Sequence, residues 1–219
     1  MVLEDIVKKR ICVMILACAT FLCACGSKVT EDTDGNFATA ISIKKDGSIE
    51  DRITEEFSEE YYDVTELESM INESISEYLK DEPQSQITLK KCRQEDNNAV
   101  VEMKYNDYNA YARFNGEKFF AGTIKEAYEA GYDLNITLNS VNSDSETASA
   151  ISKQELLNMG DNHIVILERI KINEEIQEQE PLHINCFGEI LYASEGISAS
   201  NKKTARVDMS EGLAVIVFK

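Results

Sequence analysis

Apart from carboxylates, few residues of this chain could carry out acid, base or nucleophilic chemistry. Its only imidazoles are His163 and His183, and no serine stands in the G-x-S-x-G pattern that exposes a nucleophile at a strand-to-helix turn. No cysteine has the local signature of a catalytic thiol. The pattern therefore argues against a hydrolase that uses a Ser-His or Cys-His pair, and it predicts no catalytic residue.

Carboxylates are abundant, with 40 Asp and Glu against 22 Lys and Arg and a net charge of −18. Adjacent pairs such as Glu55-Glu56 and Glu59-Glu60 could supply the acid and base of a hydrolase, but that role depends on their separation in space. A solvated acidic face explains them with fewer assumptions. The acidic excess also excludes nucleic acid as an expected partner, because binding a polyphosphate needs a basic face.

The sequence predicts no metal site and no cofactor. No group of His and Cys residues has the spacing of a zinc site. The stretch Asp32-Thr33-Asp34-Gly35-Asn36 is similar to the opening of a calcium loop, but Ile43 stands where the closing bidentate Glu is needed.

The first residues form a targeting segment. Lys8, Lys9 and Arg10 precede an uninterrupted apolar run at residues 11–23, which is typical of a secretory signal peptide. A helix that crosses the membrane needs roughly 20 apolar residues, so this run is too short to be a permanent anchor.

A lipid can supply the anchor instead. Leu22-Cys23-Ala24-Cys25-Gly26 resembles the lipobox of bacterial lipoproteins, although Cys23 is unusual at its position. The resemblance implies that the Cys25 thiol receives a diacylglycerol and that cleavage after Ala24 makes Cys25 the first residue. Attachment of two or more acyl chains, such as palmitate, gives stable anchoring. The alternative is a plain secretory signal whose apolar core contains scattered cysteines.

The expected organisation has three parts. Residues 1–24 are the signal peptide, residues 25–36 are the lipidated N-terminus and a flexible tether, and residues 37–219 form an α+β domain. The tether contains one apolar residue among several turn formers and has an r.m.s. reach on the order of 18 Å. The polar stretch at residues 141–150 could divide the domain into two lobes.

The hydrophobic pattern predicts mostly antiparallel strands with two or three short helices. Alternating apolar residues on either side of Asp46-Gly47 predict a hairpin. Asp63 can cap an amphipathic helix at about 63–80, and capping boxes open short helices at Thr123 and Ser152. Further strands are expected at residues 86–93, 99–105, 182–192 and 213–218, and another begins at His163.

Several blocks of the chain also resemble a group of lipoproteins from Gram-positive anaerobes. The blocks cover residues 41–49, 57–63, 122–133 and 188–196, and therefore span much of the expected domain. This resemblance implies localisation and a shared fold, and it supplies no catalytic residues.

Two features of the domain leave alternatives open. Cys92 and Cys186 could form a disulfide after export, but strand parity places Cys92 with Thr88 and Lys90 on a polar face, which favours free or buried thiols. The aromatic residues between 105 and 120 stand beside Asn and Asp, as in carbohydrate-binding or peptide-binding surfaces. Their spacing of three also fits a short helix that packs inward, which we favour.

These observations together favour a non-enzymatic binding domain that is lipid-anchored at the outer face of the cytoplasmic membrane. Its partners would be the membrane, through the lipid, and an envelope protein or polymer. Its negative charge is expected to keep the domain away from anionic lipid and other acidic polymers, and to attract a basic partner. An envelope hydrolase that uses paired carboxylates is the alternative.

Overall fold

The computed structural model describes residues 38–141, 150–169, 181–209 and 211–219. These residues form an α+β fold with thirteen strands in two sheets and four helices, which confirms the predicted fold class. Cys25, the signal peptide, the tether and most of the polar stretch near 141–150 lie outside the described residues. The strands that flank that stretch, β6 (Leu138–Ser140) and β7 (Ala150–Ile151), pair with each other.

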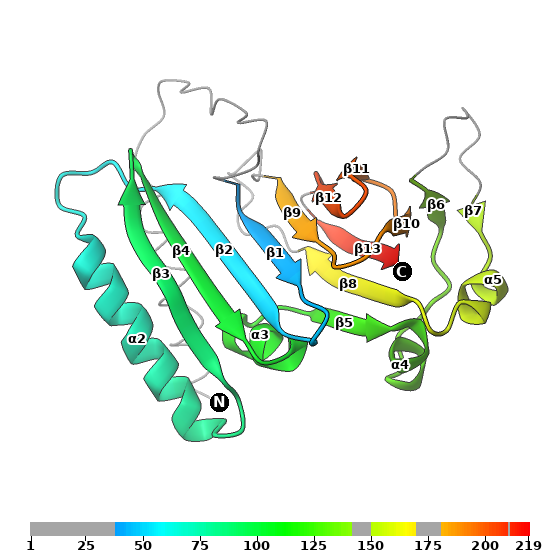
Figure 1. Cartoon of the computed structure of the whole chain (residues 1–219), viewed down its shortest axis with the longest axis horizontal. Coiled ribbons are helices and arrows are strands. Elements are labelled where there is room, and N and C mark those ends of the chain that lie inside the picture. The colour runs from blue at the N-terminus through cyan, green and yellow to red at the C-terminus, as the bar shows by residue number, and fades with distance from the viewer. Residues whose placement is uncertain (1–37, 142–149, 170–180, 210) are drawn as a thin grey trace.

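The first sheet, sheet A, has seven strands in the order β11-β12-β9-β1-β2-β4-β3 (Figure 1). Their bounds are β1 Ala40–Ile43, β2 Ile49–Glu56, β3 Ile87–Glu95, β4 Asn98–Tyr105, β9 Leu182–Asn185, β11 Ile197–Asn201 and β12 Thr204–Val207. All neighbours are antiparallel except β1 and β9, which are parallel. The predicted hairpin is formed by β1 and β2, and Gly47 takes the positive φ (82°) that its turn requires.

The amphipathic helix predicted at about 63–80 is α2 (Val64–Asp81). Asp63 accepts hydrogen bonds from the backbone N–H groups of Thr65 and Glu66, as expected of an N-cap. Ile71 and Ile75 are buried, and α2 packs beside β3 at one side of sheet A (Figure 1).

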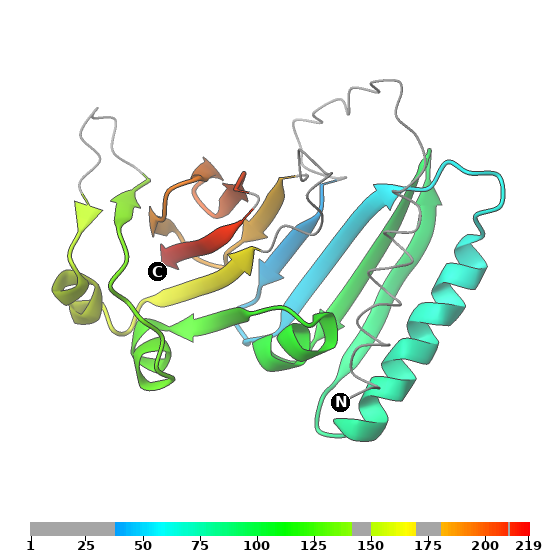
Figure 2. The ribbon, with the colours of Figure 1, turned by 180° about the vertical axis from the view of Figure 1, so that it is seen from behind.

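The second sheet, sheet B, has six strands in the order β5-β8-β13-β10-β6-β7. The bounds not yet given are β5 Phe119–Thr123, β8 His163–Arg169, β10 Ile190–Ala193 and β13 Gly212–Phe218. Helix α3 (Tyr108–Asn115) leads into β5, and the predicted capping boxes open α4 (Ile124–Glu129) and α5 (Lys153–Asn158). Figure 2 shows this half of the molecule from behind.

Sheet B is buried on both sides, which explains the continuous apolar run of β13. Val165 and Ile216 belong to the core that sheet B shares with sheet A, α2 and α3. Ile164 and Val217 belong to a second core, under α4 and α5. Strands that are covered on both faces lose the alternation of apolar and polar residues.

The apolar pattern at residues 182–192 is divided between two strands. β9 lies in sheet A and β10 lies in sheet B, because the chain turns between them at Phe187 and Gly188. A side chain at Gly188 would collide with the carbonyl oxygen of Lys219, so the crossing needs glycine. The alternation of apolar and polar residues continues through the turn, so it does not show that the chain passes from sheet A to sheet B.

Candidate functional site

The two histidines lie in different sheets. His163 begins β8, where its ring lies 4.8 Å from that of Phe187 and stacks on Phe218 at 5.4 Å, and burial lowers its pKa. His183, in β9, points to the opposite side of the strand from Ile184, as its parity predicts. Its Nδ1 atom is buried without a hydrogen-bond partner in the described structure, and burial, followed by the Arg206 charge, lowers its pKa.

The carboxylate pairs considered in the sequence lie at the surface. Glu55 and Glu56 end β2, Glu59 and Glu60 lie in the loop before α2, and all four are exposed. The structure instead brings the buried Asp51 close to another carboxylate that the sequence did not single out.

Asp51 lies on the apolar side of β2, opposite Ile41 of β1 and Met103 of β4. It is 6 % exposed, and burial, followed by the charge of Glu117, raises its pKa to about 8. Asp51 stands two residues from Ile49 and two from Ile53, so its side chain shares their inward side of the strand. This alternation could have predicted a buried acid from the sequence.

Glu117, which is exposed, and two buried tyrosines complete a polar cluster around Asp51. The Tyr111 hydroxyl donates a 2.9 Å hydrogen bond to Glu117 Oε2, and the Asn115 amide donates one of 3.2 Å to the Tyr105 hydroxyl. Desolvation of its carboxyl group beside the core raises the pKa of Glu117, while the Tyr111 hydrogen bond acts in the opposite direction. Two carboxyl groups with raised pKa values resemble an acid and base pair. However, Asp51 is enclosed by the core and neither hollow described below includes it.

The two thiols of the domain are free, as expected. Cys186 is buried beside Ile184, and burial raises its pKa to about 12. The predicted position of Cys92 was wrong. The pairing of β3 with β4 shifts between Leu89 and Lys91, and this bulge turns Cys92 toward the core, where its Sγ lies 3.8 Å from the carbonyl oxygen of Val64.

The aromatic residues between 105 and 120 are part of the core, which is the alternative favoured from their spacing. Five of these residues, Tyr105, Tyr111, Phe114, Phe119 and Phe120, are 0–5 % exposed. The Tyr105 and Tyr111 rings meet edge to face at 5.2 Å, and those of Tyr111 and Phe119 at 4.9 Å. The interpretation as a ligand-binding surface therefore does not hold for these five rings.

No group of three or more His, Cys, Asp or Glu side chains that could hold a metal ion occurs in residues 38–141, 150–169, 181–209 and 211–219. The stretch 32–36, similar to a calcium loop, lies outside this part of the chain.

One broad surface stands out as a candidate binding site. The side of sheet A that faces away from the core is polar, and we call it the polar face. Its charged members, identified by cross-strand register or ion pairing, are Lys44, Glu50, Arg52, Glu56, Lys91, Arg93, Glu95, Glu102, Lys104, Arg206 and Asp208. Six of these eleven are cations, whereas acidic residues outnumber basic ones in the whole chain. This surface could not be predicted from the sequence, because it is assembled by the bulge in β3 and by the order of the strands.

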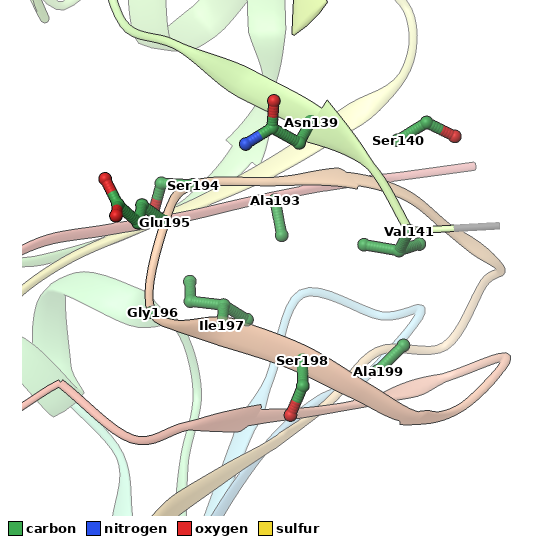
Figure 3. A pocket seen from close by; sticks show the side chains of 10 residues that line it. All are labelled: Asn139, Ser140, Val141, Ala193, Ser194, Glu195, Gly196, Ile197, Ser198 and Ala199. Carbon is green, nitrogen blue, oxygen red and sulfur yellow. The ribbon is translucent and has the colours of Figure 1, made fainter. Parts of the chain in front are cut away.

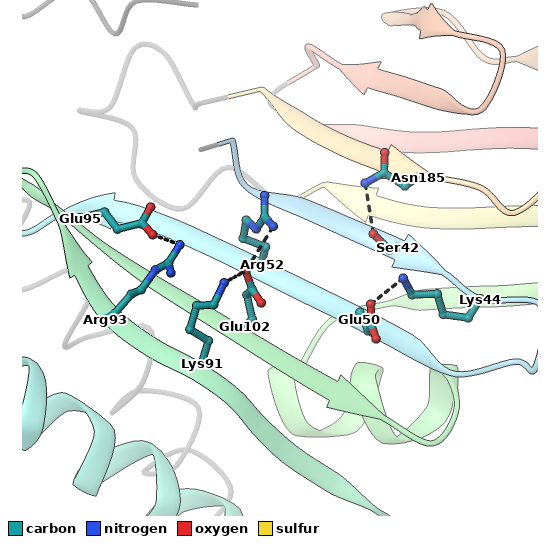
Figure 4. A network of polar contacts seen from close by, with 9 residues as sticks. All are labelled: Ser42, Lys44, Glu50, Arg52, Lys91, Arg93, Glu95, Glu102 and Asn185. Carbon is teal, nitrogen blue, oxygen red and sulfur yellow. Dashed lines mark hydrogen bonds and ion pairs between the residues drawn. The ribbon is translucent and has the colours of Figure 1, made fainter. Parts of the chain in front are cut away.

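Side chains on the polar face are linked across the strands (Figure 4). Glu102 Oε1 lies 2.9 Å from Lys91 Nζ and 3.2 Å from Arg52 Nη2. The hydrogen bond from Lys91, followed by the charges of Lys91 and Arg52, lowers the pKa of Glu102. Lys44 pairs with Glu50 at 2.5 Å, and Arg93 pairs with Glu95. Glu50, Glu95 and Glu102 are thus engaged with cations, whereas Glu56 accepts a hydrogen bond from the Ser58 hydroxyl.

Two shallow hollows lie on the described surface. One, of about 450 Å³, is on the polar face and is lined by three cations, three carboxylates and one apolar residue: Arg52, Lys91, Arg93, Glu95, Asp96, Glu102 and Val100. The other, of about 400 Å³, lies between β6 and β11 (Figure 3). Its lining side chains are small or uncharged apart from Glu195, so it offers little charge for recognition.

Comparisons with family models, with curated proteins and with solved structures give no match for this chain. No helix among the described residues is long and apolar enough to cross a membrane.

Proposed function

We propose that this chain is a lipid-anchored binding protein at the outer face of the cytoplasmic membrane. In this proposal a diacylglycerol on Cys25 holds it to the membrane, and the polar face binds an anionic polymer of the cell envelope. The lipobox supports the anchor, and the excess of cations on the polar face supports the ligand.

Local charge decides which partner the polar face attracts. At physiological ionic strength the Debye length is about 8 Å, so a ligand in contact with the face responds mainly to nearby groups and less to the net charge of −18. Glu102 is shared by two cations, and Lys104 forms no ion pair within the described structure. The face therefore keeps a positive excess, to which phosphate or carboxylate groups at the spacing of adjacent strands can bind.

Substitutions on the polar face test this ligand. We expect Lys91→Gln, Arg93→Gln and Lys104→Gln together to weaken binding of the full chain to polyphosphate or polyglutamate by about tenfold. Lys118, Lys125 and Lys153 provide a matched control, because their change to Gln alters the net charge equally on elements of the other half of the molecule. Equal losses in the two triple variants would show that only net charge matters and would refute the proposed surface.

The anchor has a separate test. Cys25→Ala should abolish metabolic labelling with a fatty acid and leave an unprocessed precursor. Continued cleavage after Ala24 in this variant would contradict the lipobox interpretation and favour a plain secretory signal.

A further inference from the structure

A second surface lies in the loop between β2 and α2, where three aromatic rings follow one another. The Phe57 and Tyr62 ring centroids are 4.8 Å apart, and those of Tyr62 and Tyr61 are 4.7 Å apart. Tyr61, at the outer end, is 76 % exposed, more than Tyr128, Leu213 or Tyr132. We call these three rings the aromatic stack. An exposed aromatic ring held by its neighbours is suited to be an anchor in an interface.

The backbone fixes the aromatic stack in place. The Phe57 N–H donates to the carbonyl oxygen of Asn97 at 2.6 Å, and the Gln94 amide donates to the carbonyl oxygen of Phe57 at 3.1 Å. These bonds tie the loop to the turn between β3 and β4. Because the loop is already ordered, a partner that binds it loses less conformational entropy.

Uncompensated negative charge surrounds the aromatic stack. Residues 53–79 contain nine Asp and Glu and no Lys, Arg or His. The exposed members of this segment that form no ion pair in the described structure include Glu56, Glu59, Glu60, Glu66, Glu73 and Glu77. By contrast, Glu50, Glu95 and Glu102 of the polar face are each paired with a cation.

The glutamates of α2 continue the acidic surface away from the stack. Glu66, Glu73 and Glu77 are spaced by seven and four residues, which places them on one stripe of the helix. Ile71 and Ile75, which pack into the core, lie on the opposite side. From Glu66 to Glu77 this stripe runs along α2 for roughly 16 Å.

We propose that the aromatic stack and the acidic stripe of α2 together form a docking surface for a lysine-rich or arginine-rich segment of another protein. Cations bind favourably over aromatic faces, and the carboxylates along α2 match a row of cationic side chains. A second copy of this chain fits less well, because the cations of its polar face alternate with carboxylates, whereas a lysine-rich or arginine-rich segment presents cations alone. This inference does not rest on the anchor or on the anionic ligand of the polar face.

Binding of a fluorescent decalysine peptide to the full chain, in an uncharged detergent, tests the surface by anisotropy. The acidic variant combines Glu59→Gln, Glu60→Gln, Glu66→Gln and Glu73→Gln. Its control makes the same change of net charge elsewhere with Glu129→Gln, Asp161→Asn, Glu195→Gln and Glu211→Gln. At an ionic strength of about 0.15 M we expect the acidic variant to weaken binding by roughly tenfold and the control by less than about twofold. Equal losses would overturn the proposal, because the peptide would then respond to net charge alone.

A second pair of variants tests the aromatic anchor. Tyr61→Ala should weaken decalysine binding by roughly two- to fivefold, and Tyr61→Phe should keep wild-type affinity, since the ring face is retained. Tyr128→Ala, at another exposed tyrosine, should have no effect. Because Tyr61 is 76 % exposed, its removal leaves the fold intact, which circular dichroism verifies. Unchanged affinity in Tyr61→Ala would remove the stack from the docking surface, and unchanged polyglutamate binding in all these variants keeps this test separate from that of the polar face.

Discussion

Replacing Asp51 by Asn should stabilise the protein at neutral pH but not in acid. The pKa of Asp51 is raised from 3.8 to about 8 in the folded state, so the folded protein keeps a proton that the unfolded chain has already released. Burial of Asp51 therefore does not lower the free energy of unfolding below about pH 4, and it lowers it increasingly as the pH rises toward 8. Each pH unit in this interval corresponds to about 1.4 kcal/mol, so the cost at pH 7 is roughly 4 kcal/mol.

Asn has nearly the shape of Asp and does not ionise. Its amide needs hydrogen-bond partners that the apolar side of β2 lacks, which offsets about 1–3 kcal/mol of the gain. We therefore expect the free energy of unfolding at pH 7 to rise by roughly 1–3 kcal/mol, with a melting temperature about 3–10 °C higher.

Urea unfolding of the wild type and the variant between pH 4 and pH 8 measures this difference. The difference between the two proteins is the informative quantity, because mutual repulsion of the other carboxylates also changes stability with pH and affects both equally. Glu59→Gln is the matched control, since it removes one exposed negative charge and should change stability by less than about 0.5 kcal/mol. A difference between wild type and Asp51→Asn that does not grow with pH would refute a raised pKa for this carboxyl.

Three further substitutions or probes test the fold. Gly188→Ala should destabilise the protein by more than about 2 kcal/mol in urea unfolding, because the new methyl group meets the Lys219 carbonyl; a smaller loss would mean that the crossing can relax. Asp63→Ala should lower stability by about 1 kcal/mol and Asp63→Ser should restore most of it, whereas equal losses would argue against capping. In a chain that begins after Cys25, a thiol reagent at pH 8 should label Cys92 before Cys186, since burial raises both pKa values but encloses Cys186 further, and simultaneous labelling would contradict this order.

Local signals predicted the elements that are governed by local physics. Asp46-Gly47, the cap at Asp63 and the boxes at Thr123 and Ser152 each act within four residues, and the structure contains all of them. The four described helices exceed the two or three predicted, because α3 was considered only as an inward-packing alternative for the aromatic residues.

The features that were missed depend on interactions between distant segments. One extra residue near Lys91 reverses the side to which Cys92 points, and nothing in the composition of β3 marks it. The polar face likewise brings together Arg206, Arg52 and Lys91 from strands that are far apart in sequence. Burial of Asp51 was within reach from alternation alone, but its proximity to Glu117 was not, because it depends on how the two sheets pack.

The parallel pairing of β1 and β9 has a consequence for the time at which the domain can assemble. The amide of Asn185 donates to the hydroxyl of Ser42, 143 positions earlier. Likewise, β13 lies between β8 and β10 and closes sheet B only after nearly all of the described chain has been made. Proteins dominated by such distant pairings fold slowly. If the chain is exported as proposed, its N-terminus would leave the translocation channel first and the domain would remain unfinished until the last strand arrives, so that transport would be complete before folding.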